Sequence, residues 1–296
     1  MKKFLMVLFA IGLATSASAQ FYISGSGGYA IGSAGVKMGE IETDANLEAT
    51  YGSYGEGLNG QLRIGYFFND TFGVDLGLGY LHGADQTLRD ITLASKGQEL
   101  NIIGRGRAFG AMPSLVYKFN DNVYGRFGAL IKIGGETEVK GTAKAFLPTG
   151  ALPTIPVDAT LDVKFDRSFK GVLPLGLTAA LGYKHNINEK FSVFVEGEYM
   201  GISVKRDKAT LDSFSGSLTT IAGAQDLTRD QLLATIQSSP ALMSDPNIQT
   251  LAVLISDETN YVTEKSKSEN SVLAETVPYS SFGINFGITY TFAKKK

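Results

Sequence analysis

Six charged side chains could do electrostatic work inside this protein, because each sits on the small-residue face of an alternating segment: Arg63, Asp75, Arg126, Lys132, Glu196 and Glu198. Side chains of a β-strand point alternately to two faces, so these charges are predicted to share an interior surface. Three positive charges match three negative ones, which favours mutual pairing over a filter for ions of one sign. Since a buried charge without a partner is costly, we expect ion pairs across a narrow interior.

The register of the first hairpin predicts one of these contacts. Pairing of the strands on either side of the turn at 69–71 would set Arg63 opposite Gly77. Asp75 then lies diagonal to Arg63, about 7–8 Å away, which a long side chain can reach.

A histidine is the one candidate for catalysis. His82 lies close in sequence to Asp85 and Thr87 and could act as a general base in a lipid-modifying enzyme. No serine elbow or third catalytic group accompanies it, so a loop histidine without a catalytic task is the stronger interpretation. His185 lies beside a short turn, away from any external site. We predict no catalytic residues.

Cofactor and metal motifs are weak. Residues 25–30 match the dinucleotide pattern G-x-G-x-x-A, but that motif needs a preceding strand and a following helix, and here more glycine follows at Gly32 and Gly35. Glycine that bends a strand explains it better. The absence of cysteine and the presence of only two histidines exclude thiol chemistry and Cys/His zinc sites.

The segment 31–58 is acidic, but its carboxylates do not follow the spacing of a Ca²⁺ loop: Glu40, Glu42, Asp44, Glu48 and Glu56, against Lys37. A solvated loop is the better interpretation. We therefore expect no metal and no cofactor.

The N-terminus predicts export. Lys2 and Lys3 precede an apolar run and then Ala17-Ser18-Ala19, which is the pattern of a signal peptide over 1–19. The run is too short to span hydrocarbon comfortably. Removing two of the 27 basic residues leaves 25 against 29 acidic ones, a formal charge of −4. No basic footprint for nucleic acid remains.

The best-defined structural element is the alternating segment 281–292, where aromatic and aliphatic residues occupy every second position: Phe282, Ile284, Phe286, Ile288, Tyr290 and Phe292. Its length suits a tilted strand crossing a bilayer, which needs about 9–11 residues. No segment has 18 uninterrupted apolar residues, so helical spans are excluded.

Alternation predicts eight strands, at 21–30, 59–68, 72–82, 107–119, 123–134, 169–184, 191–203 and 280–292. Short turns and long connections alternate, with long ones at 31–58, 83–106, 135–168 and 204–279. That asymmetry is typical of outer-membrane barrels with periplasmic turns and external loops. Pro113 and Pro174 are expected to mark bulges or strand extensions.

Aromatic residues gather beside the short turns, as expected where rings sit at a membrane interface: Tyr66, Phe68, Phe72, Tyr117, Phe119, Tyr183, Tyr290 and Phe292. A second group lies near the opposite strand ends, at Tyr29, Tyr80, Tyr199 and Phe282. The rival fold is a soluble lipocalin-type barrel of opposite polarity. Its solvent face would then carry Gly73, Gly77 and Gly79, where charged residues are expected.

Two long connections are predicted to contain structure. Alternation over 137–146 and 157–165 predicts a hairpin above the membrane. In 204–279, Thr228 with Gln231 forms a capping-box pattern, and Asp245-Pro246 begins a second helix. These helices could cap the barrel mouth, fold against the hairpins or meet another protein. We favour a cap.

Taken together, the chain resembles the small outer-membrane barrels of the OmpA, OmpX and OmpW type. The resemblance implies an all-β, eight-stranded, antiparallel, up-and-down transmembrane barrel over 20–292 in a Gram-negative outer membrane. It departs from the family at its end, because Ala293 and a lysine tail follow Phe292, at 293–296. Implied partners are outer-membrane lipid, the barrel-assembly machinery and an external ligand or protein bound by the loops. We expect a structural or adhesive role. A narrow OmpW-like channel for small or apolar solutes is the alternative, and a lipid-modifying enzyme is third.

Overall fold

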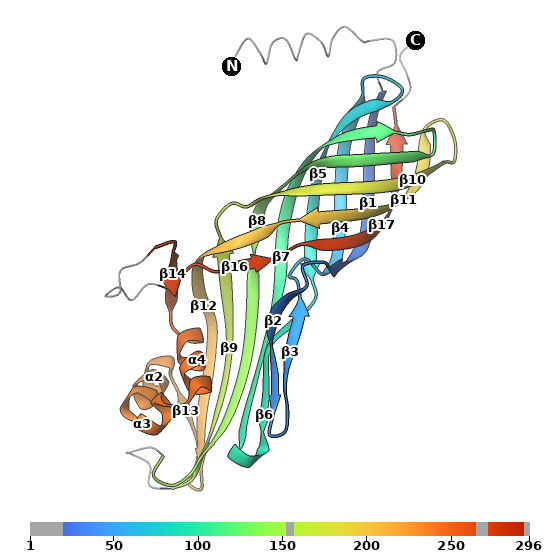
Figure 1. The fold of residues 1–296 in the computed structure, drawn as a ribbon. Coiled ribbons are helices and arrows are strands. Elements are labelled where there is room, and N and C mark those ends of the chain that lie inside the picture. The colour runs from blue at the N-terminus through green and yellow to red at the C-terminus, as the bar shows by residue number, and fades with distance from the viewer. Residues whose placement is uncertain (1–19, 152–156, 265–271, 293–296) are drawn as a thin grey trace.

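The computed structural model describes residues 20–151, 157–264 and 272–292, and these are mostly β-strand. The signal peptide predicted at 1–19 and the tail at 293–296 lie outside the described residues. Figure 1 shows an elongated molecule in which one group of strands wraps around at one end while others continue as a long sheet toward the opposite end.

The wrapped end is made by eight strands, which we call the ring: β1 (Gln20–Gly32), β4 (Gly57–Phe67), β5 (Phe72–Gly83), β7 (Gln98–Lys118), β8 (Val123–Leu147), β10 (Leu175–Asn186), β11 (Phe191–Gly201) and β17 (Ser281–Thr291). Each is antiparallel to the next in this order, and β17 pairs back onto β1. The ladder therefore returns to its first strand and leaves no free edge in this part of the structure.

Each predicted strand overlaps one strand of the ring. The largest difference is in 169–184, where β9 (Ala159–Gly171) ends and β10 begins after a break that contains Pro174. Proline lacks the N–H that a ladder needs, so the chain changes strand there. The prediction of eight strands is incomplete, because the described residues contain seventeen, and the additional ones lie outside the ring.

Burial alternates along the ring strands. In β5 the residues at even positions are largely exposed and those at odd positions mostly buried. The outward residues are large and apolar, with Leu62 68% exposed and Phe286 64% exposed. Arg63 and Glu196, which face inward, are 3% and 0% exposed. The ring therefore has an apolar outside and a polar inside.

The long sheet beyond the ring, which we call the extension, contains the distal halves of β7 and β8 together with β2 (Val36–Thr43), β3 (Leu47–Gly52), β6 (Gln86–Leu93), β9, β12 (Ser203–Thr220) and β13 (Gly223–Leu227). The predicted hairpin is confirmed as β8 and β9, with Thr137 opposite Phe169 and Leu147 opposite Ala159. β2 runs parallel to β6, so the sheet departs there from an antiparallel up-and-down arrangement. The short 3₁₀ helix η1 (Ala94–Lys96) joins β6 to β7.

Three helices pack on the extension: α2 (Arg229–Ser238), α3 (Pro240–Met243) and α4 (Pro246–Leu254). The predicted caps are confirmed, with a capping box between Thr228 and Gln231 and with the Asp245 side chain accepting from Asn247 and Ile248. Leu232, Ile236, Ile248 and Leu251 join the apolar core of the sheet. The expected cap over the mouth is therefore wrong, because these apolar faces are buried against the hairpins, far from the ring (Figure 1).

A small cluster closes the junction between ring and extension. Tyr54 and Tyr279 are 1% and 4% exposed, and their ring centroids are 5.6 Å apart. Met112, Leu130, Ile202 and Val204 complete the cluster. Three short strands follow α4 in the chain: β14 (Glu258–Val262), β15 (Val272–Leu273) and β16 (Thr276–Pro278). Within the described ranges, no helix has the length and apolar character needed to cross a membrane.

Candidate functional site

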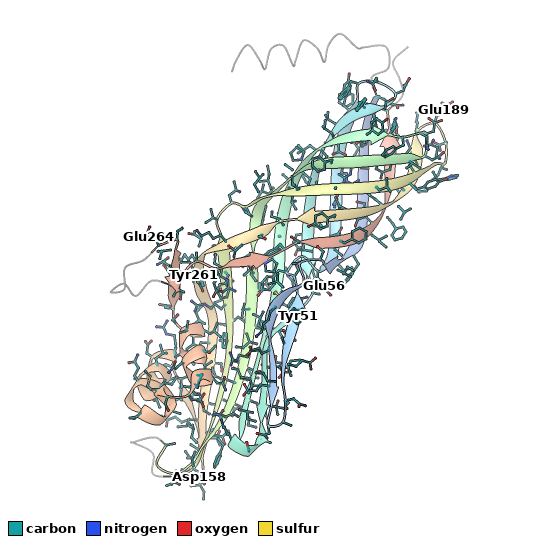
Figure 2. All side chains as sticks on the ribbon, viewed as in Figure 1. Tyr51, Glu56, Asp158, Glu189, Tyr261 and Glu264 are labelled. Carbon is teal, nitrogen blue, oxygen red and sulfur yellow. The ribbon has the colours of Figure 1, made fainter. Side chains whose placement is uncertain are left out.

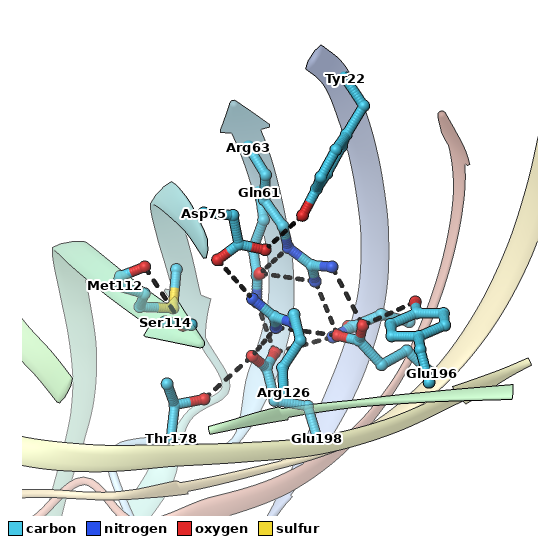
Figure 3. Close-up of polar contacts among 12 residues, drawn as sticks. Tyr22, Gln61, Arg63, Asp75, Met112, Ser114, Arg126, Thr178, Glu196 and Glu198 are labelled. Atoms are coloured by element: carbon cyan, nitrogen blue, oxygen red, sulfur yellow. Dashed lines mark hydrogen bonds and ion pairs between the residues drawn. The ribbon is translucent and has the colours of Figure 1, made fainter. Parts of the chain in front are cut away.

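The interior of the ring holds a dense group of charged side chains, shown in Figure 3. Arg63 on β4 donates to both oxygens of Glu196 on β11, from Nη2 at 2.7 Å and from Nη1 at 3.0 Å. This two-pronged contact is the strongest geometry available to an arginine and a carboxylate. The pair spans the lumen between strands that are not neighbours in the ring.

Arg126 on β8 links the remaining acids. Its Nη2 lies 2.9 Å from Glu196 and 2.7 Å from Glu198, and its Nη1 lies 3.8 Å from Asp75. The side chains of Arg126 and these three acids are at most 2% exposed. We call Arg63, Asp75, Arg126, Glu196 and Glu198 the lumen cluster.

Neutral polar groups complete it. Tyr22 donates to Asp75 at 3.0 Å and Tyr124 donates to Glu196 at 2.8 Å. Three further donors reach Glu198: Gln61 at 2.5 Å, Asn285 at 2.9 Å and Thr178 at 3.1 Å. These bonds give the buried carboxylates donors besides the two arginines.

The structure therefore brings five of the six predicted charges into contact, and it separates Lys132 from them. The Lys132 ammonium donates to the Gly135 carbonyl at 2.7 Å, toward the mouth. Without it the lumen cluster has two cations and three carboxylates, so its formal balance is −1 and not neutral. Arg63 does face Gly77, as the predicted register requires, but its ion pair is with Glu196, not with Asp75.

Sequence reasoning missed the neutral donors, although Gln61, Thr178 and Asn285 occupy the same alternating face as the charges. Glycines make room for the two tyrosine rings. A Cβ at Gly65 would lie 2.1 Å from Tyr22 Cζ, and one at Gly182 would lie 2.3 Å from Tyr124 Cζ. Each glycine is the direct cross-strand partner of its tyrosine, so the glycine-rich inner face accommodates large side chains from the neighbouring strand.

Two cavities flank the lumen cluster. The one toward the short turns has a volume of about 60 Å³ and is lined by Tyr22, Tyr124 and Arg126 among others. The one toward the mouth has a volume of about 70 Å³ and is lined by Gln61, Met112 and Tyr279 among others. The lumen cluster lies between them, so neither cavity runs the length of the ring.

The aromatic residues predicted at an interface gather at the short-turn end of the ring. Phe72 and Tyr117 lie 5.0 Å apart, as do Tyr117 and Phe119, and Tyr290 and Phe292. Tyr183 is 51% exposed, Tyr66 contacts Phe21 at 4.7 Å, and the Phe68 amide bonds the Phe72 carbonyl. These rings form an apolar band around the outside of that end.

Other candidates stay isolated. His82 is exposed on β5 and contacts the Tyr80 ring, while Asp85 pairs with Arg105. Residues 25–30 lie inside β1 and pair on both sides, so they form no dinucleotide-binding turn. Among the residues that the structure describes, no group of three or more His, Asp or Glu side chains could hold a metal.

An apolar outside around a polar, glycine-rich inside is the arrangement of a protein whose outer wall contacts lipid. The family of the outer membrane protein beta-barrel domain matches residues 4–225, which is more than half of the chain. The chain belongs to this family of outer-membrane proteins, and the family places it in a Gram-negative outer membrane.

Individual relatives are distant. An uncharacterized protein of Coxiella burnetii (strain RSA 493 / Nine Mile phase I) is 29% identical over 197 residues, which cover 61% of this chain and 74% of that protein. Among solved structures, a major outer membrane protein from Thermus thermophilus is 11% identical, with a TM-score of 0.32 and coverage of 93% and 99%. The attachment invasion locus protein Ail of Yersinia pestis is 11% identical, with a TM-score of 0.29 and the same coverage.

Proposed function

We propose that the ring is an eight-stranded transmembrane barrel with its short turns in the periplasm and the extension outside the cell. The exposed apolar side chains around the ring and the aromatic band at its short-turn end support this orientation. The extension supports it as well, because its polar face would be out of place in lipid. Figure 2 places Glu189 and Asp158 at opposite ends of the molecule, on the two sides of such a membrane.

The function that these features favour best is structural or adhesive, with the extension as the binding surface. The observation that carries this proposal is the lumen cluster. It joins buried charges from β4, β5, β8 and β11 across the interior, so the ring is closed to free flow. The extension has an apolar core of its own. Its sheet also carries exposed charged side chains, such as the pair of Lys140 and Asp166.

Planar-bilayer recordings test the closed lumen. Pure wild-type protein is expected to give no large, steady conductance, and such a conductance would refute the closed barrel. Attachment of intact cells to bare glass and to a collagen-coated surface tests adhesion. Replacing Lys140, Lys144 and Lys164 on the polar face by glutamate should weaken attachment, while Lys190→Glu at a periplasmic turn should not.

A narrow passage for small or apolar solutes is the second candidate. The cavities on both sides of the lumen cluster favour it, and the outer one has an apolar lining of Met112, Leu130, Met200 and Ile202. Passage would require the lumen cluster to rearrange. Solute-swelling assays on proteoliposomes separate the candidates, since a passage predicts solute uptake by the wild-type protein, whereas a closed barrel predicts none until Arg126 is replaced by alanine. We propose no catalytic role for this protein. Membranes that contain His82→Ala should therefore have the same lipid composition as membranes that contain the wild type.

A further inference from the structure

The outward face of β11 differs from its neighbours in size. Its middle positions carry Val193, Val195 and Gly197, between aromatic residues at both ends, Phe191 and Tyr199. The two valines are 36% and 37% exposed. On β4, by contrast, the outward residues Leu62 and Ile64 are 68% and 60% exposed. The small side chains of β11 therefore lie low on the wall.

Larger side chains border this line on both sides. Val195 lies between Tyr183 on β10 and Phe286 on β17, and Val193 lies between His185 and Ile288. These six residues line a groove of about 460 Å³ on the outer wall. Beyond Val195 toward the mouth, a Cβ on Gly197 would contact the Phe282 ring at 3.4 Å, so this ring lies over Gly197.

The shape and chemistry suit one flexible hydrocarbon chain. The residues that line the groove on β11 run from Val193 to Val195, which is about 7 Å at about 3.3 Å per residue. Its floor and walls are apolar except at the short-turn end, where the exposed His185 stands. An imidazole there can donate a hydrogen bond to a phosphate oxygen.

We propose that this groove binds a phospholipid of the periplasmic leaflet, with one acyl chain over Val193 and Val195 and the phosphate at His185. The inference rests on the proposed transmembrane orientation, which turns this wall toward lipid and its His185 end toward the periplasm. A second copy of the chain fits less well. If two copies met through this wall, the larger side chains on both sides of the groove would contact each other first. The concave groove between them would stay unfilled.

Native mass spectrometry of detergent-solubilised full-length protein titrated with palmitoyl-oleoyl phosphatidylglycerol tests the site. One lipid should remain bound to the wild type. Replacing both Val193 and Val195 by phenylalanine fills the groove and should weaken binding at least about tenfold. Val74→Phe is the matched control, because Val74 is also an outward valine, 41% exposed, between Tyr66 and Leu115. It should bind like the wild type.

A second comparison isolates the phosphate. His185→Ala should weaken binding of phosphatidylglycerol but not of a diacylglycerol with the same chains. Equal retention by the wild type and the groove-filled variant would mean an unspecific lipid shell and would overturn the proposal. A wild-type dimer that the double substitution abolishes would overturn it in favour of a second copy.

Folding is checked by the heat-dependent shift on a gel, and if the double variant misfolds, Val195→Leu replaces it. Failure of the transmembrane orientation would look different. The wild-type protein would then stay in solution without detergent, and every variant would lack bound lipid.

Discussion

The ring and the extension are built from some of the same strands, yet their faces have opposite polarity. On β7, the outward residue Phe109 is 52% exposed in the ring, while Arg107 and Arg105, next along the same face, pair with Glu138. That face changes from apolar to charged within two residues. The proposed orientation accounts for this change, because a wall in lipid needs apolar residues outside, whereas a sheet in water needs them inside.

The inward face changes in the opposite sense. Within the ring, the inward face of the strands carries the lumen cluster. Beyond the mouth, the same face of β7 carries Ile102 and Leu100, which are 3% and 5% exposed and belong to the core under the helices. The ladder between β7 and β8 shifts register between Phe109 and Gly110 of β7. On β8 this irregularity lies next to Gly135, which has a positive φ of 84°. This irregularity turns Val139 into the apolar core while Lys140 faces solvent. The two regions therefore depend on different forces, paired charges in one and apolar burial in the other.

Removing a cation from the lumen cluster should have the largest effect. Arg126→Met leaves Asp75, Glu196 and Glu198 with Arg63 as the one remaining cation of the cluster. Breaking a buried ion pair from one side costs about 3–5 kcal/mol, because an uncompensated charge stays buried. Urea unfolding in lipid vesicles should show this loss, and adding Glu198→Gln should recover part of it. Lys190→Met at an exposed turn is the control, and an equal loss there would contradict the argument.

In the extension, truncation of an apolar side chain should have the next largest effect. Leu251 on α4 is 1% exposed, and Leu251→Ala should destabilise the helical part of the extension by about 2–5 kcal/mol. Val253→Ala on the same helix is the matched control, because Val253 is 57% exposed. Hydrogen exchange should accelerate in α4 and leave the ring unchanged. Faster exchange in β1 and β17 as well would mean that the two regions unfold together.

Much of the ring could be predicted from the sequence, because a wall with two different surroundings imposes a period of two on every strand. The same alternation selected Arg63, Asp75, Arg126, Glu196 and Glu198 as inward residues. It did not exclude Lys132, since the irregularity in β8 that follows this residue depends on pairing with β7. A pattern within one strand carries no information about that pairing.

The position of the helices could not be predicted for a related reason. Capping residues such as Thr228 and Asp245 are local signals, and both helix starts are confirmed. The surface that buries those helices is made by strands distant in sequence, as in the bond from Gln98 to Asp245, which are 147 residues apart. The mouth instead is filled by Tyr54 and Tyr279, which are even farther from each other in sequence and carry no shared motif.

A smaller effect is expected at the helix cap. Thr228 accepts from the Gln231 amide while the Gln231 side chain accepts from the Thr228 amide. Thr228→Ala should destabilise α2 by about 1 kcal/mol, since the Gln231 amide loses its side-chain acceptor. Hydrogen exchange in α2 measures this. Thr235→Ala, at a half-buried residue later in the same helix, is the control and should change exchange less than the cap substitution.

The smallest effect should come from an acid at the far end of the extension. Asp158 accepts from the Thr149 hydroxyl at 2.8 Å and from the Thr149 amide at 2.7 Å, and these bonds hold its pKa below the ordinary value. A carboxyl with a depressed pKa adds stability above its unfolded pKa of about 3.9, and this is lost as pH falls through the folded pKa. Proteolysis of the turn should therefore accelerate below about pH 4 and stay constant from about pH 5 to 7. Asp158→Asn should abolish the pH step. If the pH step persists in Asp158→Asn, another acid causes it. If the same pH change also destabilises the ring, the two regions are not independent.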